Sequence, residues 1–417
     1  MADNKDKKVL NVPALRFPEF TEEWKRIKVS DLLDFYSTNS LSWEQLEYES
    51  NEPYNLHYGL IHVGLPTIID LTKDKLPSIK DGNVPKKYEL CKEGDIAFAD
   101  ASEDTNEVAK VVEFYNLDGK KVVCGLHTIH GRNNNGQTAK GFLGYCFSST
   151  VFHNQIRRIA QGTKIYSINT RNFSEVFVGL PSMNEQQKIA TLLRLMDERI
   201  ATQNKIIEKY ESLIQAIIYK VKMDGINKGT WRRIDLCKVL QERNEKNVEG
   251  RTICSVSVSQ GVVNQIEYLG RSFAAKQTSH YNVVKYGDIV YTKSPTGDFP
   301  YGIIKRSNIR EDVAVSPLYG VYIPVNDSIG VILHFYFMRP GNAFNYLHPL
   351  IQKGAKNTIN ITNRRFLENS VPLPISENEA NTIAGILKSI QEKIEIEKSL
   401  LQSYTKEKEY LLRQMFI

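Results

Sequence analysis

The chain repeats itself, and this duplication constrains its fold more than any other feature. Short elements of the first half return in the same order in the second half, and the second copy is shorter near its start. The elements are Trp24–Ile27, Gly94–Ile96, Ile168–Phe173 and Leu180–Pro181, answered by Trp231–Ile234, Gly287–Ile289, Ile361–Phe366 and Leu373–Pro374. Chance rarely reproduces several elements in order, so the sequence predicts two related halves.

A long helix is predicted after each Leu-Pro element. Residues 182–224 contain no Gly or Pro, and both segments carry apolar side chains at coiled-coil spacing. Capping boxes at Ser182–Glu185 and Ser376–Glu379 mark the two starts. The predicted pairing positions are Ile189, Leu193, Met196, Ile200, Ile207, Tyr210, Ile214, Ile383, Leu387, Ile390, Ile394, Leu401, Tyr404 and Leu411. The polar positions Gln203, Glu397 and Lys408 could set the register or contact another protein, but solvated positions are the better interpretation.

The order of these segments predicts the architecture. A helix of about 37 residues is roughly 55 Å long, too long for one small domain to cover. The first helix is expected to end near Met223, followed by a Gly-containing segment, so the second domain lies at its far end and the second helix returns antiparallel.

The predicted fold class is α+β, with two strand-rich domains in a pseudo-twofold arrangement, separated by two long antiparallel coiled-coil helices. The predicted boundaries are a flexible N-terminal tail 1–13, a first domain 14–181, a helix 182–224, a second domain 225–375 and a helix 376–417. The Gly-Asp-Ile elements are interpreted as turns that enter buried strands.

Composition narrows the class of protein. The 417 residues suffice for several globular domains, and the sequence offers neither a membrane-spanning run nor a signal peptide, so we expect a cytoplasmic protein. Five cysteines without a close Cys-x-x-Cys pair favour buried thiols over a disulfide framework. The net charge of +6 is compatible with a polyanionic partner, although it is modest.

Candidate DNA contacts cluster near the repeated elements. The loop ending at Lys164 and the nearby Arg171 correspond to Lys353–Lys356 and Arg364 in the second half. Such cations and small residues suit phosphate contacts, and amide or guanidinium side chains suit base edges. The full set is Arg132, Asn134, Gln137, Arg157, Arg158, Lys164, Arg171, Lys353, Lys356 and Arg364. For any one of them, a solvated surface position is an equally good interpretation.

Catalytic signatures occur only as near misses. Asn51–Tyr54 resembles part of a methyltransferase element, but it lacks a proline and a cofactor loop, so a turn is the better interpretation. Cys124, His127, His130 and Cys146 could in principle bind zinc, but the early ligands lie in an apparent strand and the ligand set lacks a second half, so no metal is expected. Phosphate-binding and metalloprotease motifs are missing from the sequence, so this chain is expected to be non-catalytic.

With these elements the chain resembles HsdS, the specificity (S) subunit of Type I restriction-modification systems. The resemblance covers nearly the whole chain, and its most diagnostic part is Leu180–Ala190, which leads into the first long helix. The second copy departs from it, because Ala380–Asn381 replace Gln187–Lys188 and Ile375 is inserted after Pro374.

The resemblance implies two target-recognition domains, each binding one half of an asymmetric bipartite DNA site, and helices that set the spacer. It also implies docking of two methylation (M) subunits, which use S-adenosylmethionine, and of restriction (R) subunits, which use ATP and Mg²⁺. No cofactor is expected in this chain itself. A helix of roughly 55 Å corresponds to about 10 to 15 base pairs.

Two alternatives remain open at this stage. The first is a coiled-coil scaffold whose end domains bind proteins and not DNA. The second is a self-sufficient nuclease or methyltransferase, which the missing motifs disfavour.

Overall fold

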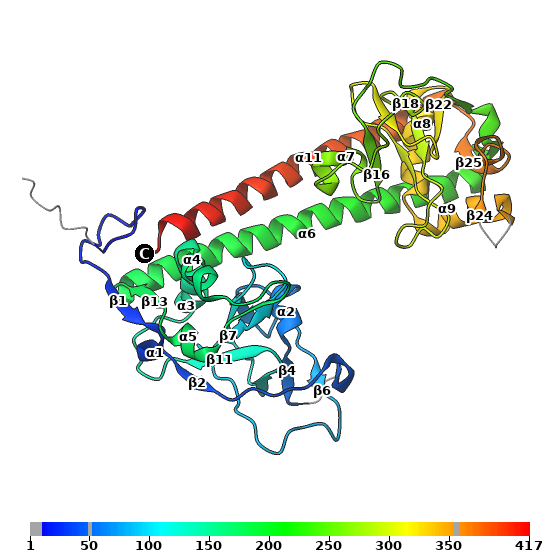
Figure 1. The fold of residues 1–417 in the computed structure, drawn as a ribbon. Coiled ribbons are helices and arrows are strands. Elements are labelled where there is room, and N and C mark those ends of the chain that lie inside the picture. The colour runs from blue at the N-terminus through cyan, green and yellow to red at the C-terminus, as the bar shows by residue number, and fades with distance from the viewer. Residues whose placement is uncertain (1–10, 49–51, 354–358) are drawn as a thin grey trace, which may run out of the picture. The chain divides into compact units, whose positions relative to one another are not determined.

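The computed structural model describes residues 11–48, 52–353 and 359–417. The chain divides into two compact units: unit 1 is Met1–Gln203 with Leu400–Ile417, and unit 2 is Asn204–Ser399. Each unit combines a mixed α and β globular part with a stretch of the long helices α6 (Met183–Lys228) and α11 (Glu377–Gln414) (Figure 1). The predicted mixed fold with two domains and long helices is confirmed. Residues 1–10 of the predicted tail lie outside the described residues.

Unit 1 contains two main sheets. The five-stranded sheet has the order β2-β11-β7-β9-β5, with β5 and β9 parallel, and the four-stranded sheet has the order β10-β4-β6-β3, with β10 and β4 parallel. Their strands are β2 (Asp34–Tyr36), β3 (Leu46–Glu47), β4 (Tyr54–Leu56), β5 (Ile68–Asp70), β6 (Ser78–Ile79), β7 (Ile96–Ala99), β9 (Val111–Asn116), β10 (Val122–Cys124) and β11 (Thr128–Arg132).

Helices α3 (Phe142–Phe147), α4 (Thr150–Ile159) and α5 (Thr170–Ser174) build the core of unit 1 against β7. The ring of Phe98 on β7 lies 4.9 Å from that of Phe147 and 4.7 Å from that of Phe173, both in edge-to-face geometry. Such aromatic pairs add stabilisation beyond burial of their area.

Unit 2 has a smaller sheet of order β15-β22-β19-β20, with helix α8 packed against it. The rings of Tyr291 on β19 and Tyr322 on β22 both stack on Phe366, at centroid distances of 4.8 and 4.6 Å. The elements are β15 (Leu240–Glu242), β19 (Ile289–Tyr291), β20 (Ile304–Arg306), β22 (Gly320–Pro324), α8 (Asp327–Phe337), α9 (Pro340–Leu347) and α10 (Asn363–Phe366). Two further antiparallel pairs are β16 (Cys254–Ser257) with β17 (Gly261–Asn264), and β18 (Asn282–Val284) with β21 (Val313–Val315).

The repeated sequence elements occupy matching places in the two units. Antiparallel β1 (Lys25–Lys28) and β13 (Phe177–Leu180) close unit 1, as β14 (Trp231–Asp235) and β25 (Ser370–Pro374) close unit 2. Gly94 and Gly287 adopt φ values of 87° and 91°, which favour glycine, and β7 and β19 begin two residues later. This confirms that the Gly-Asp-Ile elements are turns entering buried strands.

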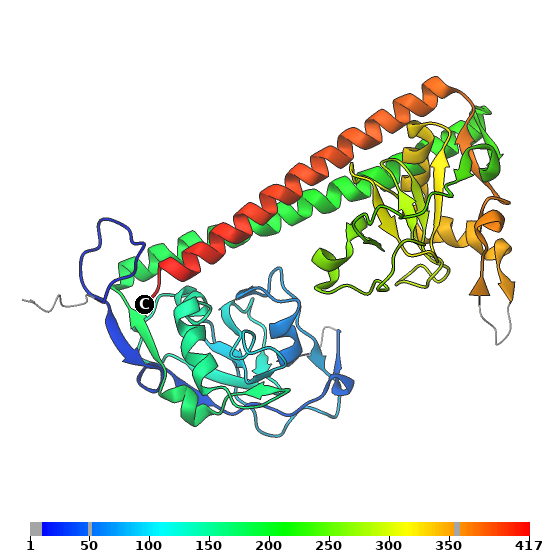
Figure 2. The same cartoon turned by 45° about the horizontal axis from the view of Figure 1, so that its top comes forward.

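The two long helices lie side by side and run in opposite directions within each unit (Figures 1 and 2). In unit 1, Asp197 forms an ion pair with Lys408 at 2.5 Å, and Arg199 Nη2 donates to the hydroxyl of Tyr404 at 2.9 Å. In unit 2, Lys398 Nζ lies 3.3 Å from Glu211, whereas Glu379, at the start of α11, accepts a hydrogen bond from Trp231, just beyond the end of α6. In both units, residues later in α6 therefore contact residues earlier in α11, which shows that the two helices are antiparallel.

All predicted pairing positions of the helices are at least half-buried. The half-buried members are Met196, Ile200, Tyr210, Leu401, Tyr404 and Leu411; the buried members are Ile189, Leu193, Ile207, Ile214, Ile383, Leu387, Ile390 and Ile394. Ile189 and Leu193 also belong to the core of the globular part of unit 1, so the start of α6 packs against its own domain.

The interpretation of the polar position Gln203 as solvated is wrong. Gln203 has only 2% of its surface exposed, Glu397 is half-buried, and Lys408 is half-buried in its ion pair with Asp197. A charged partner on the neighbouring helix lets a lysine lie along an apolar surface while its ammonium group stays paired.

Helix α6 does not end near Met223 as predicted; it continues through Gly225 to Lys228. A Cβ atom on Gly225 would lie 1.9 Å from Cδ1 of Trp231, so the residue is glycine because the indole packs directly against the helix backbone. Glycine therefore marks a close contact here and not the start of a linker.

Candidate nucleic-acid interface

Helix α4 carries the predicted pair Arg157 and Arg158. The side chain of Ser149 caps this helix by accepting a hydrogen bond from the amide of Phe152, and Phe152 and Ile156 point into the core. Both arginines are thereby left on the exposed side. Arg157 donates to Asn106 at 2.6 Å and to Asn154, whereas Arg158 forms no ion pair with any described residue.

Burial, with a smaller effect of the positive charge of Arg157, lowers the pKa of His153 on the same helix. His153 is therefore neutral at physiological pH, and the charge of α4 comes from its arginines.

Lys164 lies in an exposed loop after α4. Gln161 and Ser167 pair at the base of this loop, and β12 (Tyr166–Ser167) pairs with β8 (Ala101–Ser102). Residues 161–165 are all exposed, and Gly162 adopts a φ of 138° with Ile165 O so close that a Cβ would lie 1.9 Å away. The tight turn presents Lys164 to solvent.

Arg171 follows on the short helix α5. Asn169 caps α5 by accepting from the amide of Asn172 at 2.8 Å, and Phe173 anchors it in the core. Arg171 is exposed and forms no ion pair with a described residue. Because α4 contacts α5, the loop of Lys164 joins two neighbouring helices and the three cationic segments are adjacent in unit 1.

The corresponding segment of unit 2 has the same placement in the chain. Strands β23 (Gln352–Lys353) and β24 (Ile359–Asn360) pair before α10, on which Arg364 is exposed. Lys353 belongs to β23, but its side chain is not described, and Lys356 lies outside the described residues.

Arg132 is not available to DNA, and its prediction as a contact is wrong. It has 5% of its surface exposed, and its guanidinium group donates to both oxygens of Asp95 at 2.8 Å, to Glu89 and to the carbonyl of Leu90. These partners occupy the donors that a base edge would require, and moving the guanidinium group would remove two hydrogen bonds from the buried carboxylate of Asp95. Unit 2 has the equivalent pair, Arg243 with Asp288 at 2.6 Å.

Asn134 and Gln137 lie in the loop after β11, and both are exposed. The side-chain amide of Asn134 donates to Asp34 and, at 2.9 Å, to the hydroxyl of Tyr36, so it is oriented by contacts within unit 1. The backbone carbonyl of Gln137 accepts from Gln186 at 3.1 Å, which leaves its side chain at the surface. The hydrogen bonds of Asn134 and Gln137 thus connect this loop to β2 and to α6.

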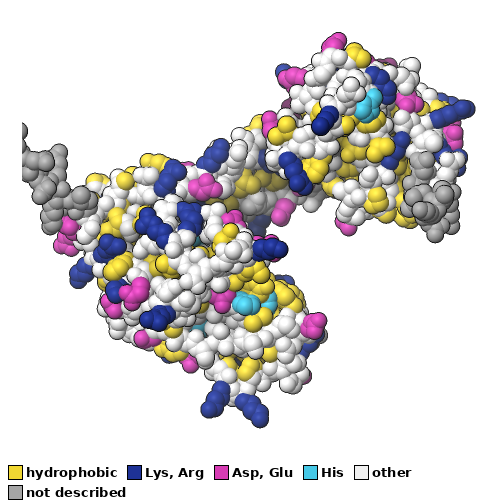
Figure 3. Space-filling model, viewed as in Figure 1, with side chains coloured by type: hydrophobic (Ala, Val, Ile, Leu, Met, Phe, Trp, Pro, Cys, Tyr) yellow, Lys and Arg dark blue, Asp and Glu magenta, His cyan; other side chains and the backbone are white. Residues whose placement is uncertain are grey.

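Positive charge does not merge into one patch on the face of unit 1 seen in Figure 3. Lys and Arg side chains lie there as separate areas between acidic and hydrophobic ones. The contacts proposed for DNA therefore depend on particular loops and helices, not on an overall basic surface.

A polar cavity of about 480 Å³ in unit 1 was not predicted from the sequence. The run Ser37–Ser40 lines one side of it, with Lys87, Tyr88 and His127 from two other segments. Hydroxyl, amide and ammonium groups of this kind suit base edges. The run Ser37–Ser40 has no periodicity and is typical of a loop. Only the fold shows that it is part of a concave surface.

Of the four residues considered for zinc, the structure brings together Cys124 and His130. His127 is exposed and hydrogen-bonded to Asp100, and Cys146 is buried in the core around α3. Cys91, which the sequence pattern did not include, joins Cys124 and His130 in one buried cluster.

Comparison with known proteins gives this fold a class. Residues 74–212 match the family model of the Type I restriction modification DNA specificity domain. The S subunit of the Type I restriction-modification system from M. genitalium has a similar structure, with a TM-score of 0.58 and 16% identity over 97% of this chain and 99% of that one. A chain from a structure on complex assembly and conformational transition of the type I R-M system matches with a TM-score of 0.52 and 14% identity, covering 94% and 97%.

The structural matches show that the chain shares the fold of these proteins, with two domains and long helices. The matched segment 74–212 is similar to the specificity domain of Type I restriction-modification systems, in agreement with the resemblance in the sequence. None of the helices in the described part of the chain is both long and apolar enough to span a membrane.

Proposed function

We propose that this chain is the non-catalytic DNA-recognition subunit of a Type I restriction-modification complex. Each unit binds one half of an asymmetric bipartite site, with Arg158, Lys164 and Arg171 in unit 1 and Lys353, Lys356 and Arg364 in unit 2 contacting the DNA. The complex acts in the cytoplasm, where its DNA substrate lies.

One observation carries this proposal: a common frame supports two different surfaces. The closing strand pairs, the Gly-Asp turns and the helices α5 and α10 correspond between units. Between these landmarks unit 1 builds the four-stranded sheet β10-β4-β6-β3, whereas unit 2 builds the pairs β16–β17 and β18–β21. Two related frames with unlike surfaces suit a site whose two halves differ in sequence.

The helices offer surfaces for docking the two methylation subunits. Besides their buried seam, α6 and α11 expose large apolar side chains to solvent: Leu195 and Tyr410 in unit 1, and Leu213, Tyr219, Ile386 and Ile396 in unit 2. Exposed apolar side chains on otherwise polar helices are typical of protein interfaces. The docked subunits bring S-adenosylmethionine, and the restriction subunits bring ATP and Mg²⁺.

Mapping of methylated adenines tests the function. DNA from cells that carry this chain with its methylation subunit should be modified at one two-part motif with a fixed spacer. A truncated chain that lacks unit 2 should lose the intact motif. Unmodified DNA in cells where the complex assembles would contradict the proposal and favour a protein-binding scaffold.

Selection of bound DNA from a random pool is a second test of the proposed function. The assembled chain and methylation subunit should enrich both half-sites, whereas a scaffold enriches none. The chain alone, incubated with DNA, Mg²⁺ and S-adenosylmethionine, should neither cut nor methylate, and activity under these conditions would show a self-sufficient enzyme.

A further inference from the structure

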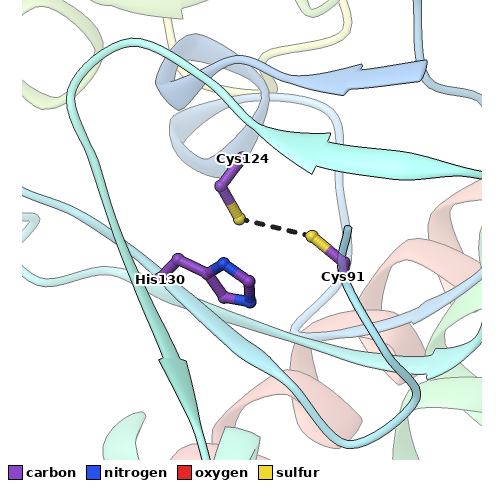
Figure 4. A group of neighbouring side chains, drawn as sticks. All are labelled: Cys91, Cys124 and His130. Carbon is purple, nitrogen blue, oxygen red and sulfur yellow. Dashed lines mark hydrogen bonds between the residues drawn. The ribbon is translucent and has the colours of Figure 1, made fainter. Parts of the chain in front are cut away.

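Cys91, Cys124 and His130 form a buried cluster between the two sheets of unit 1. Cys124 ends β10 of the four-stranded sheet, His130 lies on β11 of the five-stranded sheet, and Cys91 precedes the turn into β7. One potential ligand atom from each lies within 4.8 Å of the others, and the two sulfur atoms are 3.5 Å apart (Figure 4). Exposed fractions are 6%, 2% and 0% for Cys91, Cys124 and His130.

His130 has an unsatisfied nitrogen directed at the two sulfur atoms. Its Nε2 lies 2.7 Å from Asp95, which Arg132 also holds. Its Nδ1 is buried without a hydrogen-bond partner, and Figure 4 shows the imidazole ring beside the two cysteines, with one ring nitrogen on the side of Cys124. A buried polar atom without a partner costs free energy, and a carboxylate that holds the other ring nitrogen is the usual support of a metal-bound histidine.

The distances and charges suit zinc. Two sulfur atoms bound tetrahedrally at about 2.3 Å lie roughly 3.8 Å apart, close to the separation found here. Two thiolates and one Zn²⁺ are together neutral, and Asp95 is balanced by Arg132. A neutral assembly avoids the cost of burying net charge.

A fourth position is reachable from solvent. Cys124 lines the polar cavity of about 480 Å³ that Ser37–Ser40 and His127 also line. A water molecule entering from this cavity completes four-coordination, since zinc with three protein ligands commonly retains a water.

We propose that Cys91, Cys124 and His130 bind one Zn²⁺ ion that ties the two sheets of unit 1 together. Binding releases the two thiol protons and leaves the imidazole neutral, with Nε2–H donating to Asp95. The ion then fixes the wall of the polar cavity that Cys124 and His127 form.

Cobalt substitution and elemental analysis test the site in the full chain. Purified under reducing conditions, the protein should bind about one metal ion per chain, and Co²⁺ should give thiolate charge-transfer absorption. Cys91→Ser, Cys124→Ser and His130→Ala should each abolish this band. Cys146→Ser and His127→Ala are matched controls, a buried cysteine and a nearby histidine outside the cluster, and should retain it.

Three outcomes would overturn the proposal: substoichiometric metal in the wild type, equal loss of the band in the Cys146→Ser control, or a mass two hydrogens lighter that shows a Cys91–Cys124 disulfide. Because a Cys91 variant can fail to fold, the wild type supplies an independent measurement. A strong chelator should lower its Tm and added zinc should restore it, and an unchanged Tm counts against the site.

Discussion

At the scale of single residues, the most informative feature is an acidic anchor present in both units. Asp95 and Asp288 each accept from the backbone amide three residues earlier, at 2.8 Å, and each pairs with an arginine from a neighbouring strand or loop, buried Arg132 and half-buried Arg243. Removing one partner of such a pair leaves an uncompensated buried charge, which costs about 3 to 5 kcal/mol. Arg132 and Arg243 are therefore structural, and the exposed cations near α5 and α10 are the ones that we propose for DNA contacts.

Lys164→Ala and Arg171→Ala should weaken DNA binding by the assembled complex without changing the motif. Each removes a charge that we assign to a phosphate contact, so the slope of log affinity against log salt should fall by about 1 per substitution. Binding measured over a range of salt concentrations checks this. Lys73→Ala, an exposed lysine paired with Asp70 in the same unit, should leave the slope unchanged. Equal effects of all three substitutions would refute the assignment.

Glu113 should make the stability of unit 1 depend on pH. Burial raises the pKa of this carboxyl to about 7 from 4.5, although the amides of Gly141 and Gly144 donate to it and oppose the shift. Since the folded protein holds the proton more tightly than the unfolded one, this contribution to stability is complete below pH 4.5 and is lost as the pH rises through about 7.

Urea unfolding between pH 5 and 8 of the wild type and Glu113→Gln checks this prediction. The wild type should lose roughly 3 kcal/mol more than the variant over this range, because a pKa unit corresponds to about 1.4 kcal/mol. The difference between the two proteins isolates Glu113 from other titrating groups. Parallel stability curves would show that Glu113 does not titrate there.

At the scale of helices and strands, each long helix begins at a tryptophan from the first strand of its own unit. The indole of Trp24 donates to Glu185 at 3.2 Å, and that of Trp231 donates to Glu379 at 2.8 Å. These glutamates are the acidic members of the predicted capping boxes. In unit 1, Ser182 accepts from the amide of Glu185, but the carboxylate binds Trp24 and Arg16. In both units, the glutamate of the capping box thus links the first turn of the long helix to the tryptophan at the first strand. Local capping rules do not predict this contact.

Two glycines in the long helices should respond oppositely to alanine. Gly225→Ala should destabilise unit 2 because its new Cβ would overlap the indole of Trp231, and overpacking costs about 1 to 3 kcal/mol. Gly385→Ala on α11 meets nothing within 4 Å and should stabilise by up to about 1 kcal/mol, the difference in helix propensity.

Thermal unfolding of both variants beside the wild type measures these effects. Far-UV circular dichroism at low temperature controls for loss of helix before melting. An unchanged or raised Tm for Gly225→Ala would mean that Trp231 does not pack on the helix as described.

At the scale of the whole molecule, we propose that the length of the paired helices sets the length of the DNA spacer. Inserting one heptad near Gln203 in α6, with a matching heptad near Glu397 in α11, preserves the seam and adds about 10.5 Å. We expect the preferred spacer to lengthen by roughly three base pairs and both half-sites to remain the same.

Selection of bound DNA from a random pool checks the spacer. An insertion of equal length in the exposed turn at Asp118–Gly119, which is not among the proposed DNA contacts, is the matched control and should leave the spacer unaltered. Changed half-sites with an unchanged spacer would refute the idea that the helices act as a ruler.

Much of the architecture was predictable because its signals are periodic or repeated. The duplication predicted two related units, and apolar residues at coiled-coil spacing predicted both helices and the side chains on them that are buried or half-buried. These features depend on residues close together in the chain, where spacing alone determines which face a side chain occupies.

The sites depended on contacts between distant residues, which spacing does not encode. The sequence predicts Arg132 as a surface donor, but in the fold Asp95 and Glu89 accept its hydrogen bonds. The sequence likewise predicts a linker at Gly225, but in the fold Trp231 packs against this residue. The clearest case is the cysteine and histidine cluster: the local pattern suggested His127 and Cys146, whereas the fold brings Cys91 to Cys124 and His130. The sequence by itself determined the repeat and the helices through local periodicity, and only the tertiary structure decided which polar groups are buried and what they meet.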